Sequence, residues 1–223
     1  MKRTKLADRI LPVYSPAEET MNMATHIIGG ILGILALGLC VARSASHGSV
    51  AGVIASVVYG MSMIALYTMS SVYHGLRPGL GKKVMQVIDH CTIYLLIAGS
   101  YTPVMVCGMI PEYPLIGWGV LASVWALAFI AATLTAIDLK AYRVFSMICY
   151  IGMGWLIILF IPQLMRIMVP RGFHLLLAGG ICYTVGAVLY GLGKKLPWMH
   201  TVFHVFVVLG SLLQFLCIYQ YVL

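Results

Sequence analysis

The chain has 223 residues, of which 61% are hydrophobic and only 9% are charged, and its formal net charge is +8. Soluble domains carry roughly 25% charged residues, so this composition excludes an ordinary soluble domain and indicates a membrane protein. The basic residues stand in short clusters between apolar runs, which argues against a nucleic-acid partner. Residues 1–19 are polar and basic and lack an apolar core, so we expect no cleavable signal peptide.

Apolar runs follow one another along the chain, and each is long enough to cross a bilayer as a helix. They are too long and too uniformly apolar for the strands of a membrane barrel. We therefore predict an all-α integral membrane protein, with one seven-transmembrane domain over residues 1–223 and a cytoplasmic N-terminal segment over residues 1–20. The predicted spans are Met21–Ala42, Ser49–His74, Val84–Gly108, Pro114–Ile137, Tyr142–Pro162, Gly172–Gly191 and His200–Tyr221.

The distribution of Lys and Arg between the two sides of this bundle predicts its orientation. One side, which holds the N-terminus, carries 11 of the 14 basic residues, and the other side carries 3. The N-terminus should therefore be cytoplasmic and the C-terminus outside. The larger group is Lys2, Arg3, Lys5, Arg9, Arg77, Lys82, Lys83, Lys140, Arg143, Lys194 and Lys195, and the smaller is Arg43, Arg166 and Arg171.

Polar and ionisable side chains gather at the cytoplasmic ends of four predicted spans. Such residues inside membrane helices are functional candidates by default, because burying them in hydrocarbon is costly. With the orientation above, distant segments bring carboxylates and imidazoles to one membrane depth. These residues are Glu19 and His26 at the first span, Ser70 and His74 at the second, Asp89 and His90 at the third, and His200 and His204 at the seventh.

The spacing of these residues predicts a metal site. His200 and His204 are four residues apart, so they share one helical face and can bind one ion together. With His74 and Asp89 they offer three imidazoles and one carboxylate, a set that suits Zn²⁺ and resembles catalytic rather than structural zinc sites. The bland alternative is that a lone membrane histidine only bonds to a neighbouring helix. We apply that alternative to His90, which points elsewhere on its helix.

Five stretches of the chain carry a family resemblance: "EETMNMATHIIGG", "SSVYHG", "DHCTIYLLIAGSYTPV", "MGW" and "HTVFHVFVVLGS". In this order they resemble the bacterial hemolysin III proteins of the progestin and adipoQ receptor (PAQR) superfamily, over nearly the whole chain. The resemblance implies a cytoplasmic zinc site with His74, His200 and His204 as ligands, and Asp89 as a fourth ligand directly or through water. Ser70 matches the serine of the family's second motif. Glu19 and His26 match the first motif, whose role stays open.

The resemblance also implies candidate functions, since the family is similar to the alkaline ceramidases and linked to membrane-lipid homeostasis. The first is a bacterial inner-membrane zinc hydrolase that cleaves a lipid amide or ester, with Asp89 and Ser70 as catalytic residues and a membrane lipid as partner. The second is a non-catalytic sensor of the bilayer whose zinc is structural. The third is a cytolysin, although no amphipathic pore-forming segment is present. The sequence leaves the substrate and the oligomeric state open.

Overall fold

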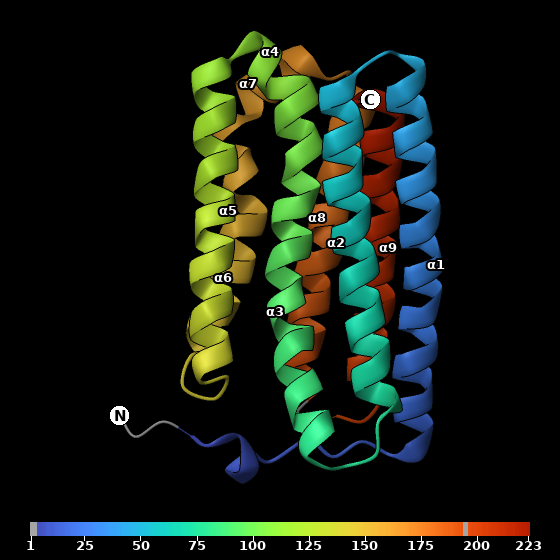
Figure 1. Cartoon of the computed structure of the whole chain (residues 1–223), viewed down its shortest axis with the longest axis vertical. Coiled ribbons are helices and arrows are strands. Elements are labelled where there is room, and N and C mark those ends of the chain that lie inside the picture. Colours follow the sequence, from blue (N-terminus) through green and yellow to red (C-terminus); the bar gives the residue numbers. More distant parts are fainter. Residues whose placement is uncertain (1–3, 194–195) are drawn as a thin grey trace.

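Seven helical stretches that are long and apolar enough to span a membrane occur in the computed structural model, which describes residues 4–193 and 196–223. They lie side by side along the long axis of the molecule (Figure 1), as the sequence predicted. The spans are α1 (Pro16–Ser46), α2 (Val50–Gly75), α3 (Leu80–Pro103) continued by the π-helix η2 (Val104–Met109) and by α4 (Ile110–Glu112), α5 (Pro114–Ile137), α6 (Arg143–Trp155) continued by the 3₁₀-helix η3 (Leu156–Phe160) and by α7 (Ile161–Ile167), α8 (Pro170–Leu192) and α9 (Met199–Tyr221).

The N-terminal segment ends earlier than the sequence suggested, because α1 begins at Pro16 rather than near residue 21. Ser15 caps the helix: its side chain accepts a hydrogen bond from the Glu18 N–H, and the Glu18 carboxylate accepts one from the Ser15 N–H. Before α1 the chain forms a short 3₁₀-helix, η1 (Leu6–Asp8), and crosses one end of the bundle (Figure 1). The two termini lie at opposite ends of the bundle, as an odd number of spans requires.

The side of the membrane that each end faces stays a prediction. Of the basic residues that predict it, Lys2, Arg3, Lys194 and Lys195 lie outside the described residues.

Helix α1 packs closely against α2 because small residues line their contact. A Cβ atom added at Gly29 would overlap the ring of Tyr67, and one added at Gly33 would lie 3.1 Å from the backbone nitrogen of Ile64. Glycine therefore allows the two backbones to approach each other, which is how membrane helices gain packing without a hydrophobic driving force. Helix α9 packs against both α1 and α8.

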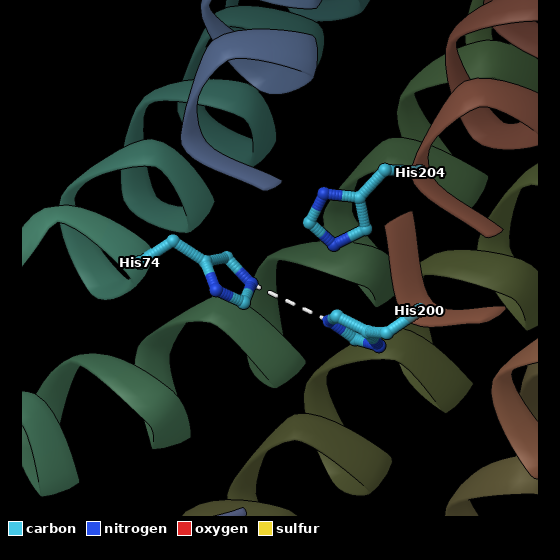
Figure 2. Close-up of side chains that lie close together, drawn as sticks. All are labelled: His74, His200 and His204. Atoms are coloured by element: carbon cyan, nitrogen blue, oxygen red, sulfur yellow. Dashed lines mark hydrogen bonds between the residues drawn. The ribbon is translucent and has the colours of Figure 1, made fainter. Parts of the chain in front are cut away.

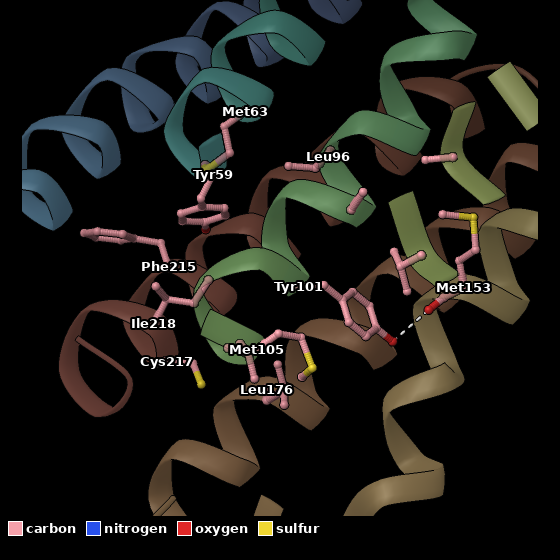
Figure 3. Close-up of a cluster of buried hydrophobic side chains, with 14 of the residues drawn as sticks. Tyr59, Met63, Leu96, Tyr101, Met105, Met153, Leu176, Phe215, Cys217 and Ile218 are labelled. Atoms are coloured by element: carbon pink, nitrogen blue, oxygen red, sulfur yellow. Dashed lines mark hydrogen bonds between the residues drawn. The ribbon is translucent and has the colours of Figure 1, made fainter. Parts of the chain in front are cut away.

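The span made of α6, η3 and α7 is interrupted near its middle, and a buried tyrosine from α3 fills the interruption. The Tyr101 hydroxyl donates to the carbonyl oxygen of Met153 at 2.8 Å (Figure 3) and accepts from the N–H of Ile157 at 2.9 Å. In a regular α-helix Ile157 would donate to Met153 directly. The side chain thus replaces the lost backbone bond where the α-helix gives way to the η3 turn, one of the known causes of helix distortion.

The hydrophobic core follows α2, α3 and α9, and its largest fully buried side chains include Tyr59, Met63 and Met105 (Figure 3). The core is less complete between α3, α6, α8 and α9, where a cavity of about 750 Å³ remains. One end of this cavity lies at the N-terminal segment, and it reaches Gln214 on α9. Gln214 stands 14 residues beyond His200, so the cavity extends about 21 Å along the helix axis at 1.5 Å per residue.

Candidate metal centre

Three buried histidines converge at the end of the bundle where the chain begins. His74 stands in the last turn of α2, and His200 and His204 stand in the first two turns of α9. One ring nitrogen from each histidine lies within 4.8 Å of the others (Figure 2), so the group could hold a metal ion. The Nε2 atoms of His74 and His200 face each other at 3.4 Å. This confirms that α2 and α9 meet at one depth, as the sequence predicted.

A carboxylate on α1 orients His74. The Nδ1–H of His74 donates to Glu19 Oε2 at 2.6 Å, since a carboxylate can only accept. The other Glu19 oxygen accepts from Lys82 Nζ at 2.7 Å, and the same ammonium donates to the carbonyl oxygens of His74 and Leu76. The proton on Nδ1 leaves Nε2 as the lone-pair donor facing the other histidines, an arrangement typical of metal-binding histidines.

A backbone carbonyl on α1 orients His204 in the same way. His204 Nδ1 lies 3.1 Å from the carbonyl oxygen of Asn22, so it carries the proton and leaves Nε2 for a metal. The Asn22 side chain is held in turn by the Thr201 hydroxyl, which donates to Asn22 Oδ1 at 2.6 Å. Helix α1 thus contributes no residue to the histidine group but fixes two of its three rings.

The N-terminal segment covers the histidines from outside the bundle. The ring of Tyr14 stacks on His200, with centroids 4.9 Å apart and planes at 21°, and lies 5.9 Å from His74. Burial of this hydroxyl raises the pKa of Tyr14, so the phenol is neutral at physiological pH. The segment before α1 therefore forms part of the wall of the site.

The remaining predicted site residues take different places. Asp89 lines the large cavity beside the histidines, but its carboxylate does not join the group within 4.8 Å. Its Oδ2 lies 3.6 Å from His90 Nδ1, and Ser70 lies next to it. The Ser70 hydroxyl is buried and makes no hydrogen bond of regular geometry to a described residue. Whether Asp89 binds a metal, directly or through water, stays a prediction.

His26 and His90 lie outside the histidine group. His26 stacks on His204, with centroids 3.6 Å apart and planes at 10°, and neither of its ring nitrogens bonds to a described residue. His90 Nδ1 lies 2.8 Å from the carbonyl oxygen of Gln86 and its Nε2 lies 3.4 Å from the Tyr190 hydroxyl. The interpretation of His90 as a hydrogen-bonding residue is confirmed.

Four residues of the site were missed in the sequence: Tyr14, Asn22, Lys82 and Thr201. A signal for Asn22 was present, because Glu19, Asn22 and His26 recur at intervals of three and four residues and so share one face of α1. No pattern in the sequence marked Tyr14 or Lys82, since both reach the site across distant segments.

Comparisons with known proteins give a family match over most of the chain. The family described as "Haemolysin-III related" matches residues 14–215. "Hemolysin-3" of Bacillus cereus is 42% identical over 206 residues, which cover 92% of this chain and 92% of that protein. The chain belongs to the haemolysin-III-related family. "Hemolysin-3 homolog" of Bacillus subtilis is 35% identical over 209 residues, which cover 94% of this chain and 96% of the relative.

A more distant relative connects this haemolysin-III-related protein to animals. The "Monocyte to macrophage differentiation factor" of Homo sapiens is 26% identical over 176 residues, which cover 74% of this chain and 68% of the human protein. The family matches confirm the resemblance predicted from the sequence motifs, including membership of the PAQR superfamily. With seven apolar helices, they identify a multi-pass membrane protein.

Proposed function

We propose that this haemolysin-III-related protein is a zinc-dependent hydrolase that cleaves an amide or ester bond of a membrane lipid, in the manner of a ceramidase. Its role would be in membrane-lipid homeostasis. One observation carries the proposal: two of the three histidines, His200 and His204, line the same apolar cavity as Asp89 and Ser70. A metal that only held helices together would need ligands alone, whereas chemistry also needs such groups beside the metal.

The donor set fits zinc. His74, His200 and His204 would hold the ion through neutral imidazoles, and Asp89 would complete the set directly or through water. Imidazole nitrogens without thiolates are typical of catalytic zinc, and the hydrogen bonds that His74 and His204 donate to Glu19 and the Asn22 carbonyl keep two rings in the metal-binding tautomer. A zinc ion held in this way supplies Lewis acidity and lowers the pKa of a bound water toward about 7.

The protein's own residues would then carry out the proton transfers. The Asp89 carboxylate would accept the proton of the attacking water and return it to the leaving nitrogen or oxygen as the acyl bond breaks. The Ser70 hydroxyl, which has no regular hydrogen bond to a described residue, would donate to the oxyanion that develops on the carbonyl. The apolar cavity would hold the acyl chain and exclude water from the reacting bond.

A further part of the proposal is that the site faces the cytoplasm from a bacterial inner membrane. Support comes from the basic residues, of which Arg77, Lys82, Lys83, Lys140 and Arg143 belong to the side that holds the histidines. A reporter fused after Leu223 should be active only outside that membrane. Activity of the fusion in the cytoplasm would reverse the orientation.

Ser70→Ala is the change that tests the catalytic function. It removes one hydroxyl that is not needed to bind zinc, so zinc content and folding should be nearly those of the wild type. The hydrolysis rate should fall by about 10²–10³-fold, as when one oxyanion donor is removed. The measurement is a panel of lipid amides and esters with wild type, Ser70→Ala and Asp89→Asn, each checked for zinc. Ser71→Ala is the matched control, since the Ser71 hydroxyl donates to the Tyr67 carbonyl instead.

Two other functions remain candidates. If zinc-loaded wild type hydrolyses nothing in the panel and Ser70→Ala still supports membrane homeostasis in cells, the protein is a non-catalytic sensor whose zinc joins α2 to α9. The relatives named "Hemolysin-3" favour a cytolysin as the other candidate. Lysis of red cells by the purified protein, independent of zinc, would support that function instead.

A further inference from the structure

Arg9, in the N-terminal segment, is a buried cation that forms no ion pair with a described residue. It is 7% exposed, and its Nε and Nη1 atoms make no hydrogen bond to any described residue. The salt bridges among described residues do not include it. A guanidinium has only donors and keeps its charge at any physiological pH, so it cannot relieve burial by losing a proton. Burying such a group is costly unless an anion accepts its hydrogen bonds.

The same side chain lines the end of the large cavity that the N-terminal segment closes. The other charged residues that line this end are Asp8, Asp89, Lys140 and Arg143. Asp8 is exposed and forms no ion pair with Arg9, and the Asp89 carboxylate lies 3.6 Å from His90 Nδ1. The cations here therefore outnumber the carboxylates. Asp138 stands two residues before Lys140, but its carboxylate already accepts hydrogen bonds from three backbone N–H groups.

Beyond this charged end the cavity is lined by apolar side chains, among them Ile93, Ile97, Met147 and Ile151. An occupant that suits both parts has an anionic head and a long apolar tail. We propose that Arg9 binds the anionic headgroup, a phosphate or a carboxylate, of a lipid whose chain fills the cavity. A guanidinium suits either anion, because its planar fork can donate two parallel hydrogen bonds. The proposal depends on the proposed function only in assuming that a lipid enters the cavity.

Binding to the full-length protein in a neutral detergent tests this proposal. The probes are dioleoyl phosphatidic acid, oleate, dioleoyl phosphatidylcholine and inorganic phosphate. Lipid retention is followed by native mass spectrometry, and the unfolding temperature is followed because a ligand that binds the folded state raises it. We expect phosphatidic acid or oleate to bind more tightly than phosphatidylcholine, and the stronger of the two identifies the anion. Inorganic phosphate that stabilises the protein as well as the lipids do would overturn the assignment to a lipid.

Arg9→Gln should weaken binding of the preferred anionic lipid by about 10–100-fold, the usual effect of losing hydrogen bonds to a charged group. Arg77→Gln is the matched control, since it removes the same charge from an exposed loop at the same end of the bundle. Arg9→Lys keeps the charge but loses the fork, so its affinity should be intermediate. Equal affinities for Arg9→Gln and Arg77→Gln would overturn the proposal, as would a wild type that does not prefer anionic lipids.

These measurements involve no hydrolysis, so they separate the two proposals. Binding that depends on Arg9 without any turnover would contradict the hydrolase alone. Turnover without an effect of Arg9→Gln on binding would contradict the headgroup site alone.

Discussion

Where α1 meets α2 and α9, glycines and hydrogen-bonded polar side chains join the helices, whereas α6 meets α3 and α8 across a cavity of about 750 Å³. In an apolar 18-residue stretch of α2, 50% of the residues are buried inside the protein. In the corresponding stretch of the span from Arg143 to Ile167, only 17% are buried. Metal ligands need a rigid surround and a bulky substrate needs room. The α1 side of the bundle would thus suit the proposed metal site, and the α6 side has room for the proposed lipid.

The largest effect should come from the carboxylate that fixes His74. Glu19→Gln removes the charge that holds both the His74 Nδ1–H and the Lys82 ammonium, and leaves the three metal-binding nitrogens in place. Zinc affinity should fall by about 10–100-fold, the usual loss when a partner of a metal ligand is removed. Competition with a chelator, followed by elemental analysis, measures it.

Glu112→Gln serves as the control for Glu19→Gln, because Glu112 is an exposed carboxylate at the other end of the bundle. His204→Ala gives the reference for complete loss of the metal. If Glu19→Gln holds zinc as tightly as Glu112→Gln, the hydrogen bonds that the Glu19 carboxylate accepts do not matter to the metal site.

A smaller effect is expected on the α6 side, where Tyr101 bridges the interruption of the helix. Tyr101→Phe leaves the Ile157 N–H without its partner, and it leaves the Met153 carbonyl with the Leu156 N–H alone. The protein should lose about 1–3 kcal/mol of stability, the cost of leaving buried polar groups unsatisfied. Thermal unfolding in detergent measures the change.

The control for Tyr101→Phe is Tyr142→Phe, since the Tyr142 hydroxyl has no hydrogen bond to a described residue in the structure. Zinc content should be that of the wild type in both variants. Equal stability of the two would mean that the interruption of α6 does not depend on the tyrosine.

The smallest effect concerns the N-terminal segment, which Asp138 ties to the loop between α5 and α6. Its carboxylate accepts from the Thr4 N–H at 2.7 Å and from the Lys140 and Ala141 N–H groups at 3.1 Å. These hydrogen bonds hold the pKa of Asp138 below its ordinary value of 3.8, and the bond from the Thr4 N–H has the largest effect. The stabilisation is therefore complete well above pH 3.8 and is lost as the pH falls through the lower, folded-state pKa.

Thermal unfolding between about pH 6 and pH 3 should show this loss as a difference between wild type and Asp138→Asn. The difference should be largest at the upper end of the range and should shrink as the pH falls below 3.8, while other carboxylates affect both proteins alike. A difference that does not change with pH would show that the Asp138 charge does not hold the segment.

The sequence by itself determined the seven spans, because hydropathy sums residue by residue and does not depend on which helices later become neighbours. It also determined that His74, His200 and His204 meet. The end of the second span and the start of the seventh lie at the same membrane depth, and a spacing of four residues places His200 and His204 on one helical face. The ends of the spans shifted where local capping, as at Ser15, extended a helix beyond its apolar run.

Only the tertiary structure decided how those histidines are held and what lies beside them. The partner of His74 is 55 residues away and the partner of His204 is 182 residues away in the chain. The Tyr101 hydroxyl completes a helix 52 residues further on, and Asp89 lies beside the histidine group rather than within it. Ring tautomers, helix interruptions and cavities depend on atoms from several segments meeting at hydrogen-bond distance. No periodicity within one segment specifies such a meeting, because the pattern of a helix records which face is buried and not what it is buried against.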